Sequence, residues 1–156
     1  MGEALLSPQD FEMLETRRKV QMVEAQMRAL PAEAHVKIEP EHFSHGGIYA
    51  RKITIPAGTL LTGEIHKYDN MNFMLSGDML VLVGTDWARI RGPEIIFAPA
   101  GIKRIAFALT ETVWVTVLPT NEQNPQVIEK MFVASTEEEY QQFLTLARAE
   151  MTKCLS

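Results

Sequence analysis

The sequence has one cysteine, no long apolar run and no excess of basic residues. Cys154 is the only cysteine among 156 residues, so no intramolecular disulfide can form, and a reducing cytoplasm is the expected compartment. No apolar run approaches the roughly 18 residues that a transmembrane helix needs, and the N-terminal residues lack the pattern of a signal peptide. The net charge is −5, with 20 acidic and 15 basic side chains. We therefore expect neither a membrane nor a nucleic-acid partner.

What remains is an ordinary globular composition, with 46% hydrophobic and 22% charged residues. The length allows one domain with a real core, together with terminal helices. We divide the chain into an N-terminal helix (1–34), a β-rich region (35–121) and a C-terminal helical segment (122–156).

The N-terminal segment has the signals of one long helix. Ser7 suits the N-cap, Pro8 suits the first helical position, and Pro31 ends a helix predicted from about Pro8 to Leu30. A heptad-like seam runs along it through Met13, Thr16, Val20, Val23, Met27 and Leu30. Charged residues lie off that seam, at Glu15, Arg17, Arg18, Lys19 and Glu24. The seam either packs on the chain's own β region or pairs with another subunit, and the second interpretation favours a homo-oligomer.

The middle region alternates short strand-like segments with turn residues. The expected strands are 49–55, 60–66, 72–75, 79–83, 87–90, 95–98, 104–108 and 113–118. Gly77-Asp78 and Gly84-Thr85-Asp86 are hairpin signals, and no segment of helical length interrupts the strands. This pattern predicts an antiparallel sandwich or barrel, so the chain is mainly β with helices at both ends.

The C-terminal region is expected to be helical. A short helix is plausible near 126–130. The run Ser135-Thr136-Glu137-Glu138 is typical of a capping box and precedes a helix to about Met151. An apolar face on that helix comes from Tyr140, Phe143, Leu144, Ala147 and Met151. We expect this helix to cover the barrel.

Two short patterns in the β region point to a family. Gly58, Glu64, His66, Asn70 and Gly77 are separated by five, one, three and six residues. Further on, the run Pro-Ala-Gly at 99–101 precedes Arg104 by two residues. This spacing resembles the two motifs of the cupin superfamily, Gly-x5-His-x-His-x3-Glu-x6-Gly and Pro-x-Gly-x2-His. The resemblance implies a single cupin-type antiparallel β-barrel, or jelly roll, with a metal ion held inside by three histidines and one carboxylate.

A further resemblance concerns the source of the protein. The stretch Gly-x-Ile-His and the later Pro-Ala-Gly-Ile-Lys-Arg and Thr-Val-Trp patterns are similar to those of small cupin-like proteins encoded by bacteriophages. It implies a phage origin and a place in the host cytoplasm.

The metal-ligand positions are largely filled by residues other than those of the family pattern, since they hold Glu64, His66, Asn70 and Arg104. Glu64 and His66 are weak candidates for ligating a divalent metal. Arg104 cannot ligate, because its guanidinium is permanently charged and has no lone pair to donate. We therefore expect no intact metal site and no cofactor.

The same residues suit a binding pocket instead. In a continuous strand, Glu64, His66 and Tyr68 share one face, and with Asn70 and Arg104 they would place polar groups inside an apolar barrel. Arg104 offers a two-pronged donor to a small anionic molecule. The alternative is that Glu64 pairs with Arg104 as an internal salt bridge and side chains fill the barrel.

Three functions follow from these alternatives. The favoured one is a cupin-like protein that binds a small anionic metabolite or nucleotide without a metal, and in a phage setting could sequester a host signal molecule. The second is a metal-dependent cupin enzyme with an altered Glu/His/Asn ligand set. The third is a structural virion or host-interaction protein that uses the barrel as a scaffold. The sequence assigns no catalytic residue, and whether any reaction is catalysed stays open.

Overall fold

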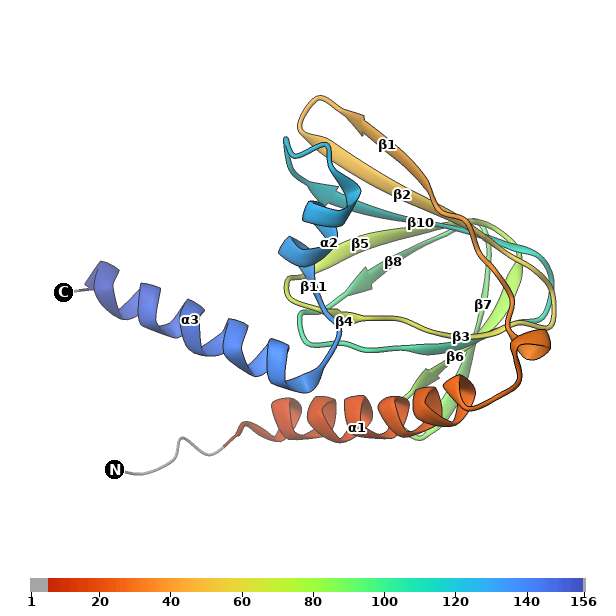
Figure 1. The fold of residues 1–156 in the computed structure, drawn as a ribbon, viewed down its shortest axis with the longest axis horizontal. Coiled ribbons are helices and arrows are strands. Elements are labelled where there is room, and N and C mark those ends of the chain that lie inside the picture. Colours follow the sequence, from red (N-terminus) through yellow and green to blue (C-terminus); the bar gives the residue numbers. More distant parts are fainter. Residues whose placement is uncertain (1–5, 156) are drawn as a thin grey trace.

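Two antiparallel sheets face each other in the computed structural model, which describes residues 6–155 (Figure 1). The helical elements are α1 (Pro8–Arg28), the 3-10 helix η1 (Ala32–Ala34), α2 (Pro125–Phe132) and α3 (Glu137–Leu155). The first strands are β1 (Glu41–His45), β2 (Ile48–Ile55), β3 (Leu60–Thr62), β4 (Ile65–His66), β5 (Asn70–Ser76) and β6 (Asp78–Val83). The remaining strands are β7 (Asp86–Arg91), β8 (Glu94–Ala98), β9 (Ile105–Ala108), β10 (Thr112–Pro119) and β11 (Val133–Ala134).

The strand order is that of a jelly roll. The larger sheet has the order β1-β2-β10-β5-β8, and the smaller sheet has the order β3-β9-β6-β7. Apart from the β1–β2 and β6–β7 hairpins, the chain crosses from one sheet to the other between successive strands of these two sheets. The predicted fold class, a mainly β antiparallel jelly-roll barrel with N-terminal and C-terminal helices, is confirmed.

Two strand predictions needed correction. The segment expected at 60–66 is broken between β3 and β4, where Gly63 and Glu64 lie outside any strand. Strand β1 was not predicted, because its sequence Glu-His-Phe-Ser-His lacks apolar alternation and all five residues are exposed. It pairs with β2 along its whole length and extends the edge of the larger sheet.

The apolar core lies between the sheets and closes one end of the barrel. Its buried residues are Ile55, Met74, Met79, Val81 and Ala108. They come from both sheets, as the alternation of inward and outward side chains along each strand requires. Burial of these side chains holds the two sheets together at this end.

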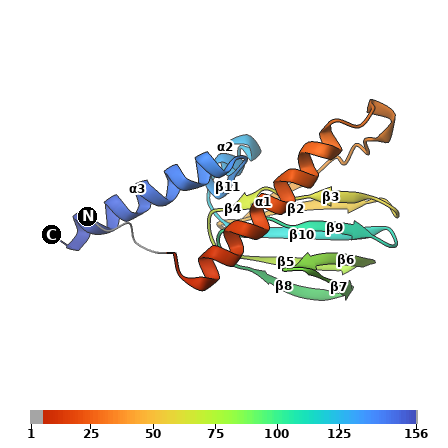
Figure 2. The same cartoon turned by 90° about the horizontal axis from the view of Figure 1, so that it is seen from below.

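Helix α1 crosses the outer face of the smaller sheet (Figures 1 and 2). At one end Glu12 lies near Gly84 in the β6–β7 turn, and at the other end Thr62 of β3 donates a hydrogen bond to Glu24. The predicted seam faces the chain's own fold, since Val20 is buried while Met13, Thr16, Val23 and Met27 are half-buried. Only Leu30 of the seam is exposed. Of the two interpretations of the seam, packing on the chain's own barrel therefore describes this structure.

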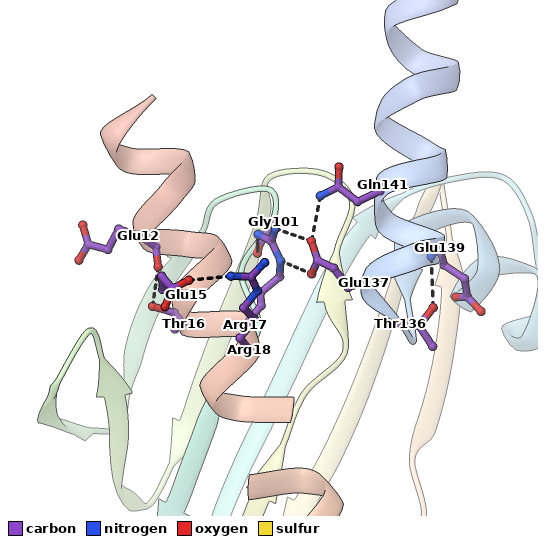
Figure 3. Close-up of polar contacts among 10 residues, drawn as sticks. All are labelled: Glu12, Glu15, Thr16, Arg17, Arg18, Gly101, Thr136, Glu137, Glu139 and Gln141. Atoms are coloured by element: carbon purple, nitrogen blue, oxygen red, sulfur yellow. Dashed lines mark hydrogen bonds and ion pairs between the residues drawn. The ribbon is translucent and has the colours of Figure 1, made fainter. Parts of the chain in front are cut away.

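The most buried charged residue of α1 joins three parts of the fold (Figure 3). Arg17 is 5% exposed, and its guanidinium donates to both carboxylate oxygens of Glu137 at 2.8 and 2.9 Å and to the carbonyl of Gly101 at 2.9 Å. It also lies 4.7 Å from the centre of the Tyr140 ring. Arg17 and Glu24 lie off the apolar seam, but both reach polar partners elsewhere in the fold that the sequence did not reveal.

Helix α3 covers less of the barrel than expected. Thr136 caps it by accepting a hydrogen bond from the Glu139 backbone, as the capping pattern predicted (Figure 3). Tyr140 packs with Ile65 and Ala134, but the helix then projects away from the barrel (Figures 1 and 2). Its later apolar residues are exposed, with Leu146, Met151 and Leu155 at 66%, 66% and 87%. No helix in residues 6–155 is long and apolar enough to cross a membrane.

Candidate functional site

A cavity of about 530 Å³ lies between the two sheets, toward the end of the barrel where α2 is placed (Figure 1). This volume is in the range of pockets that hold small molecules. The apolar part of the lining includes Ile38, Ile53, Ile55, Leu61, Met79, Val81, Ala106, Trp114, Leu118, Ile128 and Phe132. The polar part includes His42, Tyr49, Arg51, Thr62, Glu64, His66, Asn72, Arg104, Thr116, Gln126 and Glu129. The barrel is therefore not filled by its own side chains.

Three of the five predicted site residues line this cavity, namely Glu64, His66 and Arg104. Tyr68 does not, and its predicted place inside the barrel was wrong. It follows β4 rather than continuing a strand, is 49% exposed, and packs edge-on against Phe132 and Phe143 with ring centres 5.8 and 5.2 Å away. The break in the strand removed the shared face on which the prediction depended.

Asn70 does not line the cavity. It joins His66 to a chain of hydrogen bonds that begins at Trp114. The indole nitrogen of Trp114 donates to Asn72 Oδ1 at 3.1 Å, and Asn72 Nδ2 donates to Asn70 Oδ1 at 2.9 Å. Asn70 Nδ2 then lies 2.6 Å from His66 Nδ1. The Thr116 hydroxyl also donates to Asn72 Oδ1, at 2.7 Å.

This chain fixes the proton position on His66. An indole nitrogen can only donate, so the oxygen of Asn72 must face Trp114, and each amide along the chain then presents its NH₂ group to the next acceptor. His66 Nδ1 is therefore an acceptor, and the proton of the neutral ring is on Nε2. Burial, followed by the charge of Arg104, lowers the pKa of His66 from 6.5 to about 4. The ring is neutral at pH 7 and offers one donor.

Arg104 is one of two arginines that line the cavity, the other being Arg51. Arg104 is half-buried, and the one hydrogen bond of its side chain among residues 6–155 is a long one, 3.3 Å from Nη2 to the carbonyl oxygen of Phe97. Within the same residues it forms no ion pair, so the internal salt bridge with Glu64 that we considered is not made. Burial lowers the pKa of Arg104, because removing the guanidinium from water disfavours its charge. Its donors remain available to a ligand.

Glu64 lines the cavity together with a second acidic residue, Glu129, and Oε2 of Glu64 is buried without a hydrogen-bond partner. Burial raises the pKa of Glu64, although the nearby ammonium of Lys103 opposes the shift. Lys103 itself is fully buried and donates to the carbonyl of Gly63 at 2.8 Å and to Glu24 at 3.2 Å. An unsatisfied buried carboxyl oxygen costs free energy unless a ligand or water supplies a donor.

The residues present do not fit the metal that cupins hold. Within residues 6–155, no group of three or more His, Cys, Asp and Glu side chains is placed to hold an ion. The donor set explains this, since His66 Nδ1 is taken by Asn70, the amide of Asn70 points to that ring, and Arg104 adds a positive charge. Glu64 and His66 alone are a weak pair of ligands.

The sequence did not reveal Asn72, Trp114 and Thr116 as parts of the site. The alternation of Asn70 and Asn72 on β5 was a usable signal, because a polar pair on an inward face needs partners. Those partners come from β10, where Thr116 lies directly opposite Asn72. Identifying them required the register of two strands that are far apart in the sequence. His42 also lines the cavity, and it is exposed but bonded to the Tyr49 hydroxyl at 2.6 Å.

Comparison with known proteins gives similarity of structure only. No family model and no curated protein match the sequence. Among solved structures, the chain is similar to a cupin superfamily protein from Desulfitobacterium hafniense DCB-2, with 9% identity, a TM-score of 0.46, and coverage of 59% of this chain and 90% of the other. A cupin-2 domain containing protein from Shewanella frigidimarina NCIMB 400 has 11% identity, a TM-score of 0.45, and coverage of 60% and 97%. KdgF from Halomonas sp. has 15% identity, a TM-score of 0.47, and coverage of 59% and 94%.

Proposed function

We propose that this cupin-like protein binds a small anionic metabolite or nucleotide inside its barrel, without a metal ion. The observation that carries the proposal is the Arg104 guanidinium, which lines an apolar cavity and has no carboxylate partner among residues 6–155. Hydrogen bonds between a guanidinium and a carboxylate or phosphate are about twice as strong as neutral ones and can be two-pronged. An anion would therefore satisfy donors that the protein leaves free.

The histidine beside Arg104 supports the same ligand chemistry. Its ring is neutral at pH 7 and has its proton on Nε2, so it contributes a second donor without a second charge. The amide chain from Trp114 holds the ring in that form before any ligand arrives. A pre-organised donor of this kind lowers the ordering cost of binding.

Glu64 adds a requirement on the ligand. Its unpartnered Oε2 accepts a hydrogen bond when the carboxyl is ionised, and a hydroxyl or amino group on the ligand would supply it. We therefore favour a ligand that carries an anionic group together with a hydrogen-bond donor, which is true of nucleotides and of amino and hydroxy acids. The apolar walls would contact the rest of the molecule.

The biological role that we propose depends on the resemblance to cupin-like proteins of bacteriophages. A phage protein that binds a host signal molecule inside its barrel lowers the free concentration of that molecule without catalysing a reaction. The proposal therefore assigns no catalytic residue, and no contact in the cavity favours a metal-dependent reaction.

Isothermal titration with defined probes tests the proposal. The probes are AMP, citrate, glutamate and phosphate, with adenosine as the neutral counterpart of AMP. We expect at least one anion to bind and adenosine to bind more weakly than AMP. The variant Arg104→Met should weaken binding of that anion by about 10-fold or more, because a charge-assisted hydrogen bond contributes roughly 1.5 to 3 kcal/mol.

The matched control is Arg91→Met. Arg91, at the end of β7, is 68% exposed and pairs with Asp78 outside the cavity. Its loss should leave the affinity unchanged. The proposal fails if none of the four anions binds, or if Arg104→Met binds the anion as tightly as the wild-type protein.

A further inference from the structure

The outer face of the larger sheet is almost entirely apolar. Inward side chains of β2, β5 and β10 line the cavity, so the alternate residues point outward. The outward residues of the larger sheet include the apolar Phe43, Ile48, Ala50, Met71, Phe73, Leu75, Ile95, Phe97, Val115 and Val117, together with the polar Glu41 and His45 of the edge strand β1 and Lys52 and Thr54 of β2. Six of the apolar ones are strongly exposed, namely Phe97 (72%), Ile48 (53%), Phe43 (52%), Leu75 (52%), Ile95 (51%) and Met71 (40%).

Strand register makes these residues one continuous surface. Val117 of β10 lies opposite Met71 of β5, which lies opposite Phe97 of β8. The next row on this face joins Val115, Phe73 and Ile95 in the same way. Side chains directly opposite on neighbouring strands are in contact distance, so the rows form an apolar surface without gaps.

Nothing in residues 6–155 covers this surface. Helix α1 lies on the smaller sheet, while α2 and α3 lie at one end of the barrel (Figures 1 and 2). A monomer in solution rarely exposes an apolar patch larger than a few hundred Å². A five-stranded sheet is roughly 24 Å wide, and a strand of six residues is about 20 Å long. Because its side chains are uneven in height, the accessible area of the face is larger than its outline. It approaches the area of about 800 Å² that each partner buries in a stable interface.

The charges of the surface favour a second copy of the chain as its partner. The row through Val117, Met71 and Phe97 carries no charged side chain, and in the next row Lys52 of β2, opposite Val115, is paired with Glu41 of β1 at 3.0 Å. A two-fold interface brings the same surface of both subunits together, so an unpaired charge near the axis would meet its own copy. Neither row contains an unpaired charge, and the face offers no charge pattern that would select a different protein.

We infer that two copies of this chain pack through the outer faces of their larger sheets. Two antiparallel sheets stack in this way about 10 Å apart, with interdigitating side chains. The contact buries Met71 and Phe97 at its centre and leaves both cavities accessible, because the cavity is on the opposite face of the same sheet. Assembly through the sheet replaces the predicted assembly through α1, whose seam packs on its own barrel.

Light scattering coupled to size-exclusion chromatography tests this inference on the full chain. The wild-type protein should have twice the 17.6 kDa mass of one chain. Both Met71→Glu and Phe97→Glu should have the mass of one chain, because each places a charge in the apolar contact. Phe97 is 72% exposed in the single chain, so this variant should fold even if Met71→Glu does not, and circular dichroism checks both.

The matched control is Met22→Glu. Met22 is 67% exposed on α1, and the substitution is the same as at Met71. This variant should keep the doubled mass. A wild-type protein with the mass of one chain would overturn the inference. So would folded Met71→Glu and Phe97→Glu proteins that stay dimeric, or a Met22→Glu protein that dissociates.

Discussion

Acidification should destabilise the protein through His66. The pKa of this histidine is about 4 in the folded chain, against 6.5 for an exposed histidine. Because the folded value is depressed, the unfolded chain binds a proton between these pH values that the folded chain does not bind. The contribution of His66 to stability is thus fully present above pH 6.5, and it is lost as the pH falls toward 4.

The size of the effect follows from the two pKa values. At about pH 5, most unfolded molecules carry the proton and few folded molecules do, which lowers the free energy of unfolding by about 2 kcal/mol relative to neutral pH. Urea unfolding of the wild-type protein and of His66→Gln at both pH values isolates this contribution. Carboxylates with lowered pKa values, such as Glu137, also stabilise the fold less at lower pH. They do so equally in the wild-type protein and in His66→Gln, so their effect cancels in the comparison.

A proton NMR titration of His66 measures the same quantity directly. Arg104→Gln should raise the pKa of His66, because the charge of Arg104 is one cause of the shift, but burial is the larger cause and should keep it below 6.5. The reasoning is refuted if His66 titrates near 6.5 in the wild-type protein. It is also refuted if wild-type and His66→Gln lose equal stability between neutral pH and about pH 5.

Two further predictions concern stability and are measured by urea unfolding. Arg17→Ala should cost more than about 2 kcal/mol, because it leaves the half-buried carboxylate of Glu137 without its cationic partner, whereas Arg18→Ala should change stability by less than about 0.5 kcal/mol, since that side chain is 60% exposed. Equal effects of these neighbours would contradict the docking role of Arg17. Gly77→Ala should cost more than about 3 kcal/mol, because the backbone φ is +111° and a Cβ atom would lie 2.6 Å from a backbone Cα of β10. Gly63→Ala, with open space around it, should cost less than about 1 kcal/mol, and a larger loss there would undermine the steric argument.

The fold was largely predictable because its signals are local. Strand segments, turn glycines and helix caps each depend on neighbouring residues. Gly58, Gly77 and Gly101, which the motif spacing identified, all have a positive φ, which glycine adopts without strain. The break after Thr62 was not predictable, because Leu60 to His66 has the composition of one strand. As a consequence, we predicted Tyr68 inside the barrel, whereas the structure places it outside the cavity.

The site was predicted only in part, because its organisation depends on contacts between distant segments. Glu64, His66 and Arg104 were found from motif spacing, and all three line the cavity. The role of Asn70 depends on Asn72 and β10, and the burial of Arg17 depends on α3, about 120 residues away in the chain. Apolar periodicity also could not show that the second half of α3 has no surface to cover, since the pattern gives a face but not its partner.

The glycine of the second motif has a use that does not involve the cavity. Gly101 has a φ of +85°, and a Cβ atom there would lie 2.7 Å from the Tyr140 hydroxyl and 3.3 Å from the Arg17 guanidinium. Its carbonyl also accepts from Arg17, so this one residue lets both terminal helices dock on the same loop. Helix docking therefore gives the Pro-Ala-Gly segment a structural role that does not depend on any metal ligand. In this chain, the Pro-Ala-Gly motif, which resembles part of a metal-binding motif, provides the loop on which α1 and α3 pack.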